Sequence, residues 1–435
     1  MSLMPILEWS TERHSDLVRQ RLTAPDGGLP ARVCDDARAI IADVRERGDL
    51  ALLDLTARFD GVHLAADALR VDPATIRESA AQASPELADA IRMAIRNVRT
   101  FHQAQLPAPV RVDGPAGATL ELIWSPVASA GLYVPGGRAA YPSTVIMNAV
   151  PALAAGVPRL AVFTVPGMVE NNAAVACALH ELGLTEVYRV AGAQAIAAAA
   201  FGTQSIRPVD VITGPGNAWV AAAKREVIGR VGIDSIAGPS EVLILCDEIC
   251  NPQFAALDML AQAEHDPMAR VVLAGTDRRT LDAILAALEV ELATAPRRDI
   301  ALDALRDHGL VLLADTNDEL VEICALMAPE HLQLMLRDPP DPSQLLAGAI
   351  FIGNYTPTAV GDYIAGPNHV LPTGGACRFS GPLNVMTFLR PTSVVRSNAA
   401  AMAVWGPAGA IIADLEGLDA HARALRARTT NTGAL

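Results

Sequence analysis

The sequence predicts an α/β protein built on parallel sheets, and three features of the chain indicate this class. From about residue 127 onward, short apolar runs alternate with alanine-rich stretches of helical character. Each of these apolar runs ends in a turn, often of glycine and proline, as strands do where they connect to a helix. A chain of 435 residues, 51% hydrophobic and 19% charged, can bury the cores of two or three domains.

Two amphipathic helices are predicted within the first hundred or so residues. The first ends before Gly48, and its apolar face consists of Ala37, Ile40, Ile41 and Val44. The second begins with Ser84 as N-cap, followed by Pro85 and Glu86 in its first turn. Its apolar stripe consists of Leu87, Ile91, Ile95 and Val98.

Four consecutive strand-then-helix units follow. They are "ASAGLYVPGG" with "PSTVIMNAVPALAAG", "RLAVFTVPG" with "NNAAVACALHELG", "EVYRVAG" with "AQAIAAAAFG", and "VDVITGPG" with "NAWVAAAKREVIG". This order predicts a parallel sheet with helices on its faces.

The alternation resumes after residue 240, with "QFAALDMLAQAEHD" before "RVVLAG" and "TLDAILAALEVELATA" before "GLVLLAD". This second block predicts either a tandem domain or a nested arrangement in which residues 132–240 are inserted into a larger domain. The pattern leaves both arrangements open. The last fifty residues predict a smaller helical appendage.

Charge and hydropathy exclude several classes of partner. The formal net charge of −14 and the lack of a basic cluster argue against nucleic acid and anionic lipid. The most apolar region, residues 145–167, is interrupted by Pro151, Pro158 and Arg159 and cannot form a membrane-spanning helix. Without a signal pattern at the N-terminus, we expect a cytoplasmic protein whose six cysteines, free of any C-x-x-C pair, are buried thiols.

Two glycine-containing loops follow predicted strands, "VPGG" at residues 134–137 and "GPGN" at residues 214–217. Ligands of parallel sheets bind at the carboxyl ends of strands, and a helix N-terminus there favours an anion such as a pyrophosphate. Neither loop has the G-x-G-x-x-G pattern. By motif alone, an ordinary tight turn between strand and helix is therefore the favoured interpretation, and a ligand-binding loop is the alternative.

The stretch "AQAEHDPMAR" at residues 261–270 contains a candidate metal site. Gln262 and His265 are three residues apart, so on a helix they share a face and can converge on one ion. Pro267 is expected to end that helix. The alternative is a solvated helix face.

Glu330 and His331 are adjacent in "APEHLQ". On a helix they point in different directions, so they can reach different atoms of one ligand, and both residue types can act as general bases. The alternative is a surface pair at a helix start. Asp362 and His369 lie among glycines and prolines, which predicts loop positions and either a site or a structural loop. His421 is isolated and by itself predicts a surface histidine of a helix.

Motifs for the commonest hydrolases, metalloproteases, P-loop nucleotidases and zinc fingers are missing from the sequence. Other stretches, in order, resemble the motifs of the histidinol dehydrogenase family across nearly the whole chain. These are "GLYVPGGRAAYPSTVIMNAVPA", "GAQAIAA", "GPGNAWVAAAKR", "DSIAGPSEVL", "QAEHD", "APEHLQ", "GAIFIGNYTPTAVGDYIAGPNHVLPT" and "LDAHARALRAR". One departure is Met386-Thr387-Phe388, where the family often has an acidic residue before the phenylalanine.

The resemblance implies a zinc-containing homodimer that oxidises L-histidinol to L-histidine through histidinal and reduces two NAD⁺. Its implied zinc ligands are Gln262, His265, Asp362 and His421, with His421 contributed by the partner subunit. Nitrogen and oxygen ligands suit a zinc ion that leaves room for substrate.

Further roles are implied by the same resemblance. His331 would be the general base and Glu330 would activate the water that adds to the aldehyde. The substrate-binding positions would be Ser240, Gln262, His265, His331, Asp362, His369, Glu416 and His421, with Glu416 also from the partner chain. The NAD-binding positions would be Tyr133, Gln194 and Asn217.

The implied fold has two incomplete Rossmann-like parallel-sheet domains, one inserted in the other, with helical N- and C-terminal extensions, in an intertwined homodimer. The expected divisions are an N-terminal helical extension (1–30), a discontinuous α/β domain with the zinc and catalytic residues (31–131 and 241–382), an NAD-binding domain (132–240) and a C-terminal dimerisation arm (383–435).

Two alternatives remain. One is a relative acting on another alcohol, such as a sulfopropanediol dehydrogenase. Such a relative would differ after "VPGG", and Glu416 and His369 suit a cationic, imidazole-bearing substrate better than a sulfonate. A two-lobed metal- or solute-binding protein would need a secretory signal and would not require Glu330 beside His331.

Overall fold

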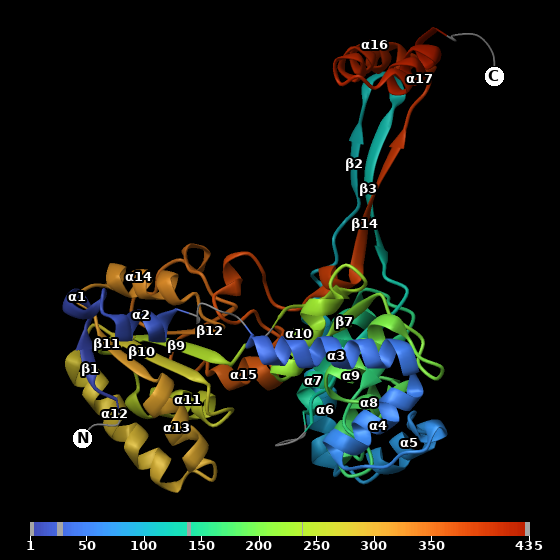
Figure 1. Ribbon diagram of the computed structural model, residues 1–435. Coiled ribbons are helices and arrows are strands. Elements are labelled where there is room, and N and C mark those ends of the chain that lie inside the picture. The colour runs from blue at the N-terminus through green and yellow to red at the C-terminus, as the bar shows by residue number, and fades with distance from the viewer. Residues whose placement is uncertain (1–3, 24–28, 137–140, 237, 431–435) are drawn as a thin grey trace.

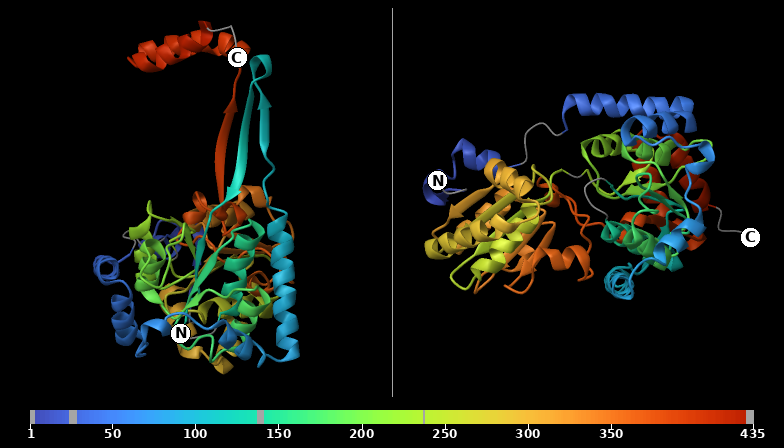
Figure 2. Two further views of the ribbon diagram at one scale, coloured as in Figure 1. Left: turned by 90° about the vertical axis from the view of Figure 1, so that its right-hand side faces the viewer. Right: turned by 90° about the horizontal axis from the view of Figure 1, so that it is seen from below.

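The computed structural model describes residues 4–23, 29–136, 141–236 and 238–430. These residues form two α/β lobes and a narrow stalk that extends from one of them (Figures 1 and 2). We name the lobes after their sheets, the six-stranded lobe and the five-stranded lobe. No helix among the described residues is long and apolar enough to cross a membrane.

The sheet of the six-stranded lobe is parallel and has the strand order β1-β11-β10-β9-β12-β13. Its strands are β1 (Ile6–Glu8), β9 (Glu241–Cys246), β10 (Arg270–Gly275), β11 (Leu310–Leu313), β12 (His331–Met335) and β13 (Ala349–Ile352). The helices of this lobe are α1 (Trp9–Glu12), α2 (Asp16–Leu22), α11 (Pro252–Ala263), α12 (Arg278–Thr294), α13 (Arg298–His308), α14 (Asn317–Met327) and α15 (Thr358–Tyr363).

Helices cover both faces of this sheet, which explains why its central strands read as continuous apolar runs. In β9, Val242 and Ile244 pack into the core formed with α11, α12 and α13. Leu243 and Leu245 point the other way, into the core formed with α1, α2 and α14. The N-terminal segment, expected to be purely helical, thus also supplies an edge strand, β1.

The sheet of the five-stranded lobe is also parallel, with the order β6-β5-β4-β7-β8. Its strands are β4 (Ala130–Tyr133), β5 (Leu160–Phe163), β6 (Val187–Tyr188), β7 (Val211–Thr213) and β8 (Gly232–Ile233). Its helices are α3 (Ala31–Arg47), α4 (Asp49–Asp60), α5 (Pro73–Ala80), α6 (Pro85–Gln103), α7 (Pro142–Ala154), α8 (Ala173–Glu181), α9 (Gly192–Phe201) and α10 (Ala218–Val227).

The four expected strand-then-helix units all form in this sheet, as β4–α7, β5–α8, β6–α9 and β7–α10. The two early helices also form as expected. Ser84 caps α6 by accepting a hydrogen bond from the Leu87 amide, and Gly48 follows α3 with φ of 59°. The cysteines are free thiols, and all are buried except the partly exposed Cys377.

The placement of α3 to α6 corrects one expected boundary. Residues 31–131 were expected to join residues 241–382, but α3 and α4 pack with α9 and α10, and α5 and α6 pack with α7 and α8. The apolar faces of α3 to α6 pack together with α7 to α10. They thereby complete the two hydrophobic cores, one on each face of the five-stranded sheet. The six-stranded lobe instead takes its N-terminal part from residues 4–22.

The stalk corrects a second boundary, because the segment after residue 383 is not purely helical. It contains β14 (Leu389–Arg396), which pairs antiparallel with β3 (Thr119–Pro126), and β3 pairs with β2 (Val110–Asp113). At its tip lie α16 (Ala399–Leu415) and α17 (Asp419–Thr430). Pro391 is tolerated within β14 because this strand forms an edge of the three-stranded sheet.

Candidate functional site

His331 is the first residue of β12, and its ring is almost fully buried. Nδ1 lies 3.1 Å from the main-chain oxygen of Glu241, and because a carbonyl can only accept, Nδ1 is the donor. Nε2 lies 3.6 Å from Asp362 Oδ1 and has no hydrogen-bond partner among the described residues. The pattern of bonds therefore leaves Nε2 as the atom available for proton transfer.

Glu330 is held by the same residue of the neighbouring strand. Its Oε2 accepts a hydrogen bond from the Glu241 amide at 2.8 Å and lies 3.6 Å from His331 Nδ1. The expected helix at "APEHLQ" is corrected, because α14 ends at Met327 and His331 begins a strand. Both side chains thus contact the main chain of Glu241, on the strand that pairs with β12.

The two side chains influence each other's protonation. Burial raises the pKa of Glu330 to about 7, and the neighbouring His331 opposes this rise. Burial by itself would lower the pKa of His331, but the carboxylates of Glu330 and Asp362 outweigh it and raise the pKa to about 9. Strongly perturbed acid and base groups side by side are typical of a catalytic site.

Two of the expected metal ligands, His265 and Asp362, lie within electrostatic range of His331, and Gln262 precedes His265 by three residues. Gln262 is in the last turn of α11, is 5% exposed, and its Nε2 has no hydrogen-bond partner within the described chain. His265 lies just beyond the end of α11 and so is not on a continuous helix with Gln262, as the spacing had suggested. Its ring interacts electrostatically with Asp362 and His331.

Asp362 lies in the short helix α15, where a loop was expected, and His369 lies on a loop as expected. His369 Nδ1 donates to the main-chain oxygen of Asp362 at 2.9 Å. Burial raises the pKa of the Asp362 carboxyl, but His331, His369 and His265 outweigh this effect and lower it. Four of the expected side chains therefore lie within electrostatic range of one another.

Ser240 directly precedes Glu241, and its main-chain oxygen accepts a hydrogen bond from the Arg270 amide. Glu416 and His421 are not brought to this site within one chain. Both are exposed at the tip of the stalk, away from the six-stranded lobe (Figure 1). Accordingly, the described residues of the single chain contain no group of three His, Cys, Asp or Glu side chains that could hold a metal ion.

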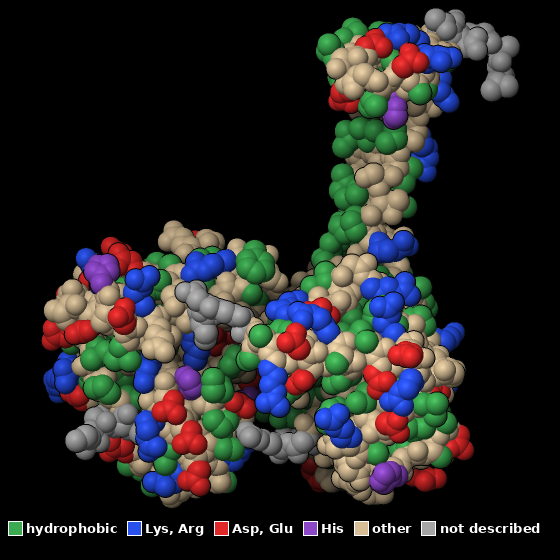
Figure 3. Space-filling view, in the orientation of Figure 1, with side chains coloured by type: hydrophobic (Ala, Val, Ile, Leu, Met, Phe, Trp, Pro, Cys, Tyr) green, Lys and Arg blue, Asp and Glu red, His purple; other side chains and the backbone are tan. Residues whose placement is uncertain are grey.

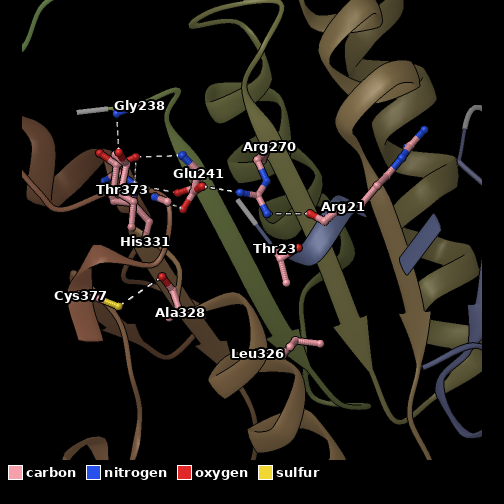
Figure 4. A network of polar contacts seen from close by, with 12 residues as sticks. Arg21, Thr23, Gly238, Glu241, Arg270, Leu326, Ala328, His331, Thr373 and Cys377 are labelled. Carbon is pink, nitrogen blue, oxygen red and sulfur yellow. Dashed lines mark hydrogen bonds and ion pairs between the residues drawn. The ribbon is translucent and has the colours of Figure 1, made fainter. Parts of the chain in front are cut away.

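The site lies at the amino ends of its strands, which the sequence did not indicate. The buried ion pair between Glu241 and Arg270, 2.7 Å apart, was also missed. Arg270 donates in addition to the main-chain oxygen of Arg21, and Glu241 Oε2 accepts from the Gly374 amide, so that Glu241 lies between Arg270 and His331 (Figure 4). The available signal was a charged residue at the start of each of two otherwise apolar strands, "EVLILC" and "RVVLAG".

The expected NAD positions lie at the carboxyl edge of the five-stranded sheet. The chain runs outward from β4 to β6 and then returns to β7 on the other side of β4, which makes the gap between β4 and β7 a topological switch point. Ligands of doubly wound sheets bind at such a point. Tyr133 ends β4 and Asn217 follows β7, so both expected loops meet here, although Gly137 lies outside the described residues.

Two of these side chains already make hydrogen bonds in the protein, and the third is buried. The Tyr133 hydroxyl accepts from the Gly192 amide, and Gln194 is buried in the first turn of α9. Asn217 caps α10 by accepting from the amides of Trp219 and Val220. Tyr133 and Asn217 therefore shape the loops of the switch point through their own hydrogen bonds.

Several known proteins are similar to this chain, and they share one family name. A sequence model of the histidinol dehydrogenase family matches residues 30–429. The chain is 48% identical over 409 residues to histidinol dehydrogenase of Gluconobacter oxydans, covering 94% of this chain and 95% of that protein. It is 49% identical over 392 residues to the enzyme of Cereibacter sphaeroides, covering 89% and 90%.

A solved structure shows the same fold. The crystal structure of histidinol dehydrogenase from Elizabethkingia anophelis matches with a TM-score of 0.91 and 32% sequence identity, and the match covers 98% of both chains. The resemblance found in the sequence motifs is thereby confirmed over nearly the whole length. The chain belongs to the histidinol dehydrogenase family and is an oxidoreductase.

Proposed function

We propose that this protein oxidises L-histidinol to L-histidine through histidinal, with two NAD⁺ as hydride acceptors and one Zn²⁺ per subunit. The observation that carries this proposal is the buried Glu330–His331 pair, with a free Nε2 directed at Asp362. His331 is a base with a fixed tautomer, and the Glu330 carboxyl group lies beside it. Together they can accept the protons that two successive oxidations release. Membership of the family supports histidinol as the substrate.

The residues present fit a zinc ion. The buried Gln262 amide has an unsatisfied polar atom within the described chain. The His265 amide donates to the main-chain oxygen of Gln262, and the His265 ring lies within electrostatic range of Asp362, so a nitrogen and an oxygen ligand are available near it. We propose that Gln262, His265 and Asp362 hold the ion together with His421 of the partner subunit. When bound, the ion would orient the imidazole and amine of histidinol and neutralise Asp362, which favours the uncharged form of His331.

NAD is proposed to bind at the switch point between β4 and β7, where the loops after Tyr133 and Thr213 meet. In the first oxidation His331 Nε2 accepts the hydroxyl proton while the carbinol carbon gives a hydride to NAD⁺, which forms histidinal and NADH. Ser240 and His369, near the same strand edge, and Glu416 of the partner subunit would contact the substrate.

The second oxidation needs water. Glu330 would accept a proton from a water molecule as its oxygen adds to the aldehyde carbon. The protonated His331 would return its proton to the former carbonyl oxygen, which gives the hydrate and frees His331 to act as a base again. His331 would then accept a hydroxyl proton from the hydrate while a second hydride leaves to a second NAD⁺, which gives the carboxylic acid. A carboxyl group with a pKa raised by burial is suited to exchanging protons near neutral pH.

We further propose that two chains form a homodimer through the stalk. Apolar side chains are exposed along it and at its tip (Figure 3), and they include Val110, Val112, Val395, Val404, Ile411, Ile412 and Leu415. The tip itself buries only a small alanine-rich core around α16 and α17. Exposed apolar side chains concentrated on one narrow element support contact with another protein surface, here a second copy.

The proposed reaction is tested by counting NADH formed per L-histidinol consumed, with the protein as purified, after chelation and after zinc is restored. Two NADH per histidinol, lost on chelation and regained with zinc, is the expected result. Failure of zinc-loaded protein to form NADH from histidinol, while it oxidises another amino alcohol, would move the function to that substrate.

A further inference from the structure

Lys224 is the only lysine of the chain, which otherwise uses arginine for its basic side chains. It lies on α10 and is 3% exposed. Nζ lies 2.6 Å from Asp234 Oδ1 and 2.5 Å from the main-chain oxygen of Gly214. The side chain therefore points from the helix back to the loop from which the helix begins.

Asp234 completes this arrangement from the other side. Its Oδ2 accepts a hydrogen bond from the Gly214 amide at 2.7 Å, and its side chain is as buried as that of Lys224. Both main-chain polar groups of Gly214 are thus bound by one ion pair. We call Lys224, Asp234 and Gly214 the loop clamp.

The clamped residue has a conformation that only glycine adopts easily. Gly214 has a φ of 116°, and a Cβ atom there would lie 2.0 Å from the main-chain oxygen of Tyr133. The main chain at Gly214 is therefore in close contact with the end of β4, at the switch point. The clamp fixes the distance between the two loops that meet there.

Stability alone is a weak reason for such a pair. Removing two charges from water costs about as much as their attraction returns, and apolar residues of similar volume often replace a buried ion pair without loss. A buried pair that fixes one backbone conformation contributes geometry instead. The position of the clamped loop indicates which geometry is needed.

We propose that Lys224 and Asp234 are positioning residues for the cofactor, because they hold the loop of residues 214–217 in the shape that binds NAD⁺. This inference rests on the proposed function, since it assumes that NAD⁺ binds at the switch point. The clamp does not touch the reacting atoms, and its effect is on the affinity for the dinucleotide.

The test compares NAD⁺ binding, measured by calorimetry on the full-length protein, between wild type and a neutral pair in which Lys224→Met is combined with Asp234→Asn. The neutral pair leaves no unpaired charge and keeps an acceptor for the Gly214 amide. We expect its Kd for NAD⁺ to rise about tenfold or more, with zinc content unchanged. A Kd within twofold of the wild type would overturn the proposal.

A matched control exists in the same lobe. Arg159 and Glu186 form an ion pair 2.7 Å apart. Arg159 directly precedes β5 and so lies at the amino ends of the strands, opposite the switch point. Arg159→Met combined with Glu186→Gln is expected to leave the Kd for NAD⁺ unchanged. An equal loss of affinity in this control would show that losing any ion pair of the lobe weakens NAD⁺ binding through general destabilisation. That result would overturn the proposal.

The single lysine allows a second measurement that does not depend on any variant. Lysine labelled with ¹⁵N at Nζ gives one side-chain signal, and we expect this signal to shift on titration with NAD⁺ with the same Kd that calorimetry reports. An unchanged signal at saturating NAD⁺ would overturn the clamp. Absence of NAD⁺ binding to the wild type would instead overturn the proposed function.

Discussion

The ring of His331 donates its Nδ1 proton to the main-chain oxygen of Glu241, while the amide of Glu241 donates to the carboxylate of Glu330. One peptide segment of β9 therefore fixes the base, its tautomer and the neighbouring acid. Side chains held by main-chain groups of a central strand have little conformational freedom, which favours a defined catalytic geometry.

His331→Ala should lower turnover by about 10²- to 10⁴-fold, because it removes the proposed general base. The zinc content should stay at that of the wild type, since His331 is not a proposed ligand. Initial rates of NADH formation and metal analysis of the same preparation check both points. Loss of zinc together with activity would contradict the separation of the two roles.

Arg270→Met should destabilise the protein by about 3–5 kcal/mol, because it leaves the Glu241 carboxylate buried without its partner. Combining it with Glu241→Gln should restore most of this loss. Denaturant unfolding measures both free energies. The surface pair of Arg278 and Asp282 offers a control, since Arg278→Met should change the free energy of unfolding by at most about 0.5 kcal/mol.

Asp258→Asn should stabilise the protein more at pH 8 than at pH 5. Asp258 is buried against Gln333 Nε2 at 2.6 Å, and burial raises its pKa from 3.8 to about 6. The folded state therefore prefers the protonated carboxyl, so stability is lost as pH rises from the unfolded pKa through the folded pKa. Above pH 6 the buried carboxylate lowers the free energy of unfolding by about 3 kcal/mol. Roughly half of this loss is already present at pH 5.

Unfolding curves of both proteins across this pH range check the prediction. The difference in free energy of unfolding should grow by about 1.5 kcal/mol between pH 5 and pH 8. A difference that is the same at every pH would show that Asp258 stays in one ionisation state throughout.

His421→Ala and His331→Ala proteins should restore activity to each other when their subunits are mixed. In a mixed dimer the chain that keeps His331 receives the intact His421 of its partner, so one of two sites is complete. With random mixing half of the dimers are mixed, which predicts about a quarter of the wild-type activity. Inactive mixed dimers, verified as such by differential tags, would contradict a shared site.

Chelation should abolish NADH formation without unfolding the lobes, because the lobe that carries Gln262, His265 and Asp362 has its own hydrophobic cores. Circular dichroism before and after chelation measures the secondary structure, and zinc should restore activity. Unfolding on chelation would show that the metal has a structural role as well.

Local signals explain how much of the fold was predictable. Apolar periodicity and N-caps identified α3, α6 and the four strand-then-helix units, because these features depend on neighbouring residues. The strand β14 was missed, since its eight residues are mostly exposed and only their pairing with β3, more than 260 residues earlier, makes them a strand. Such pairing leaves little local pattern.

The candidate site shows the same division. The sequence by itself determined which residue types were available, and the order of its motifs indicated the family and hence Gln262, His265, Glu330, His331 and Asp362. Only the tertiary structure decided that Glu241 and Arg270 support this site, that it lies at the amino ends of the strands, and that Lys224 turns back to Gly214. The physical reason is that a buried charge needs a partner, and the partner is chosen by packing in space rather than by position in the sequence.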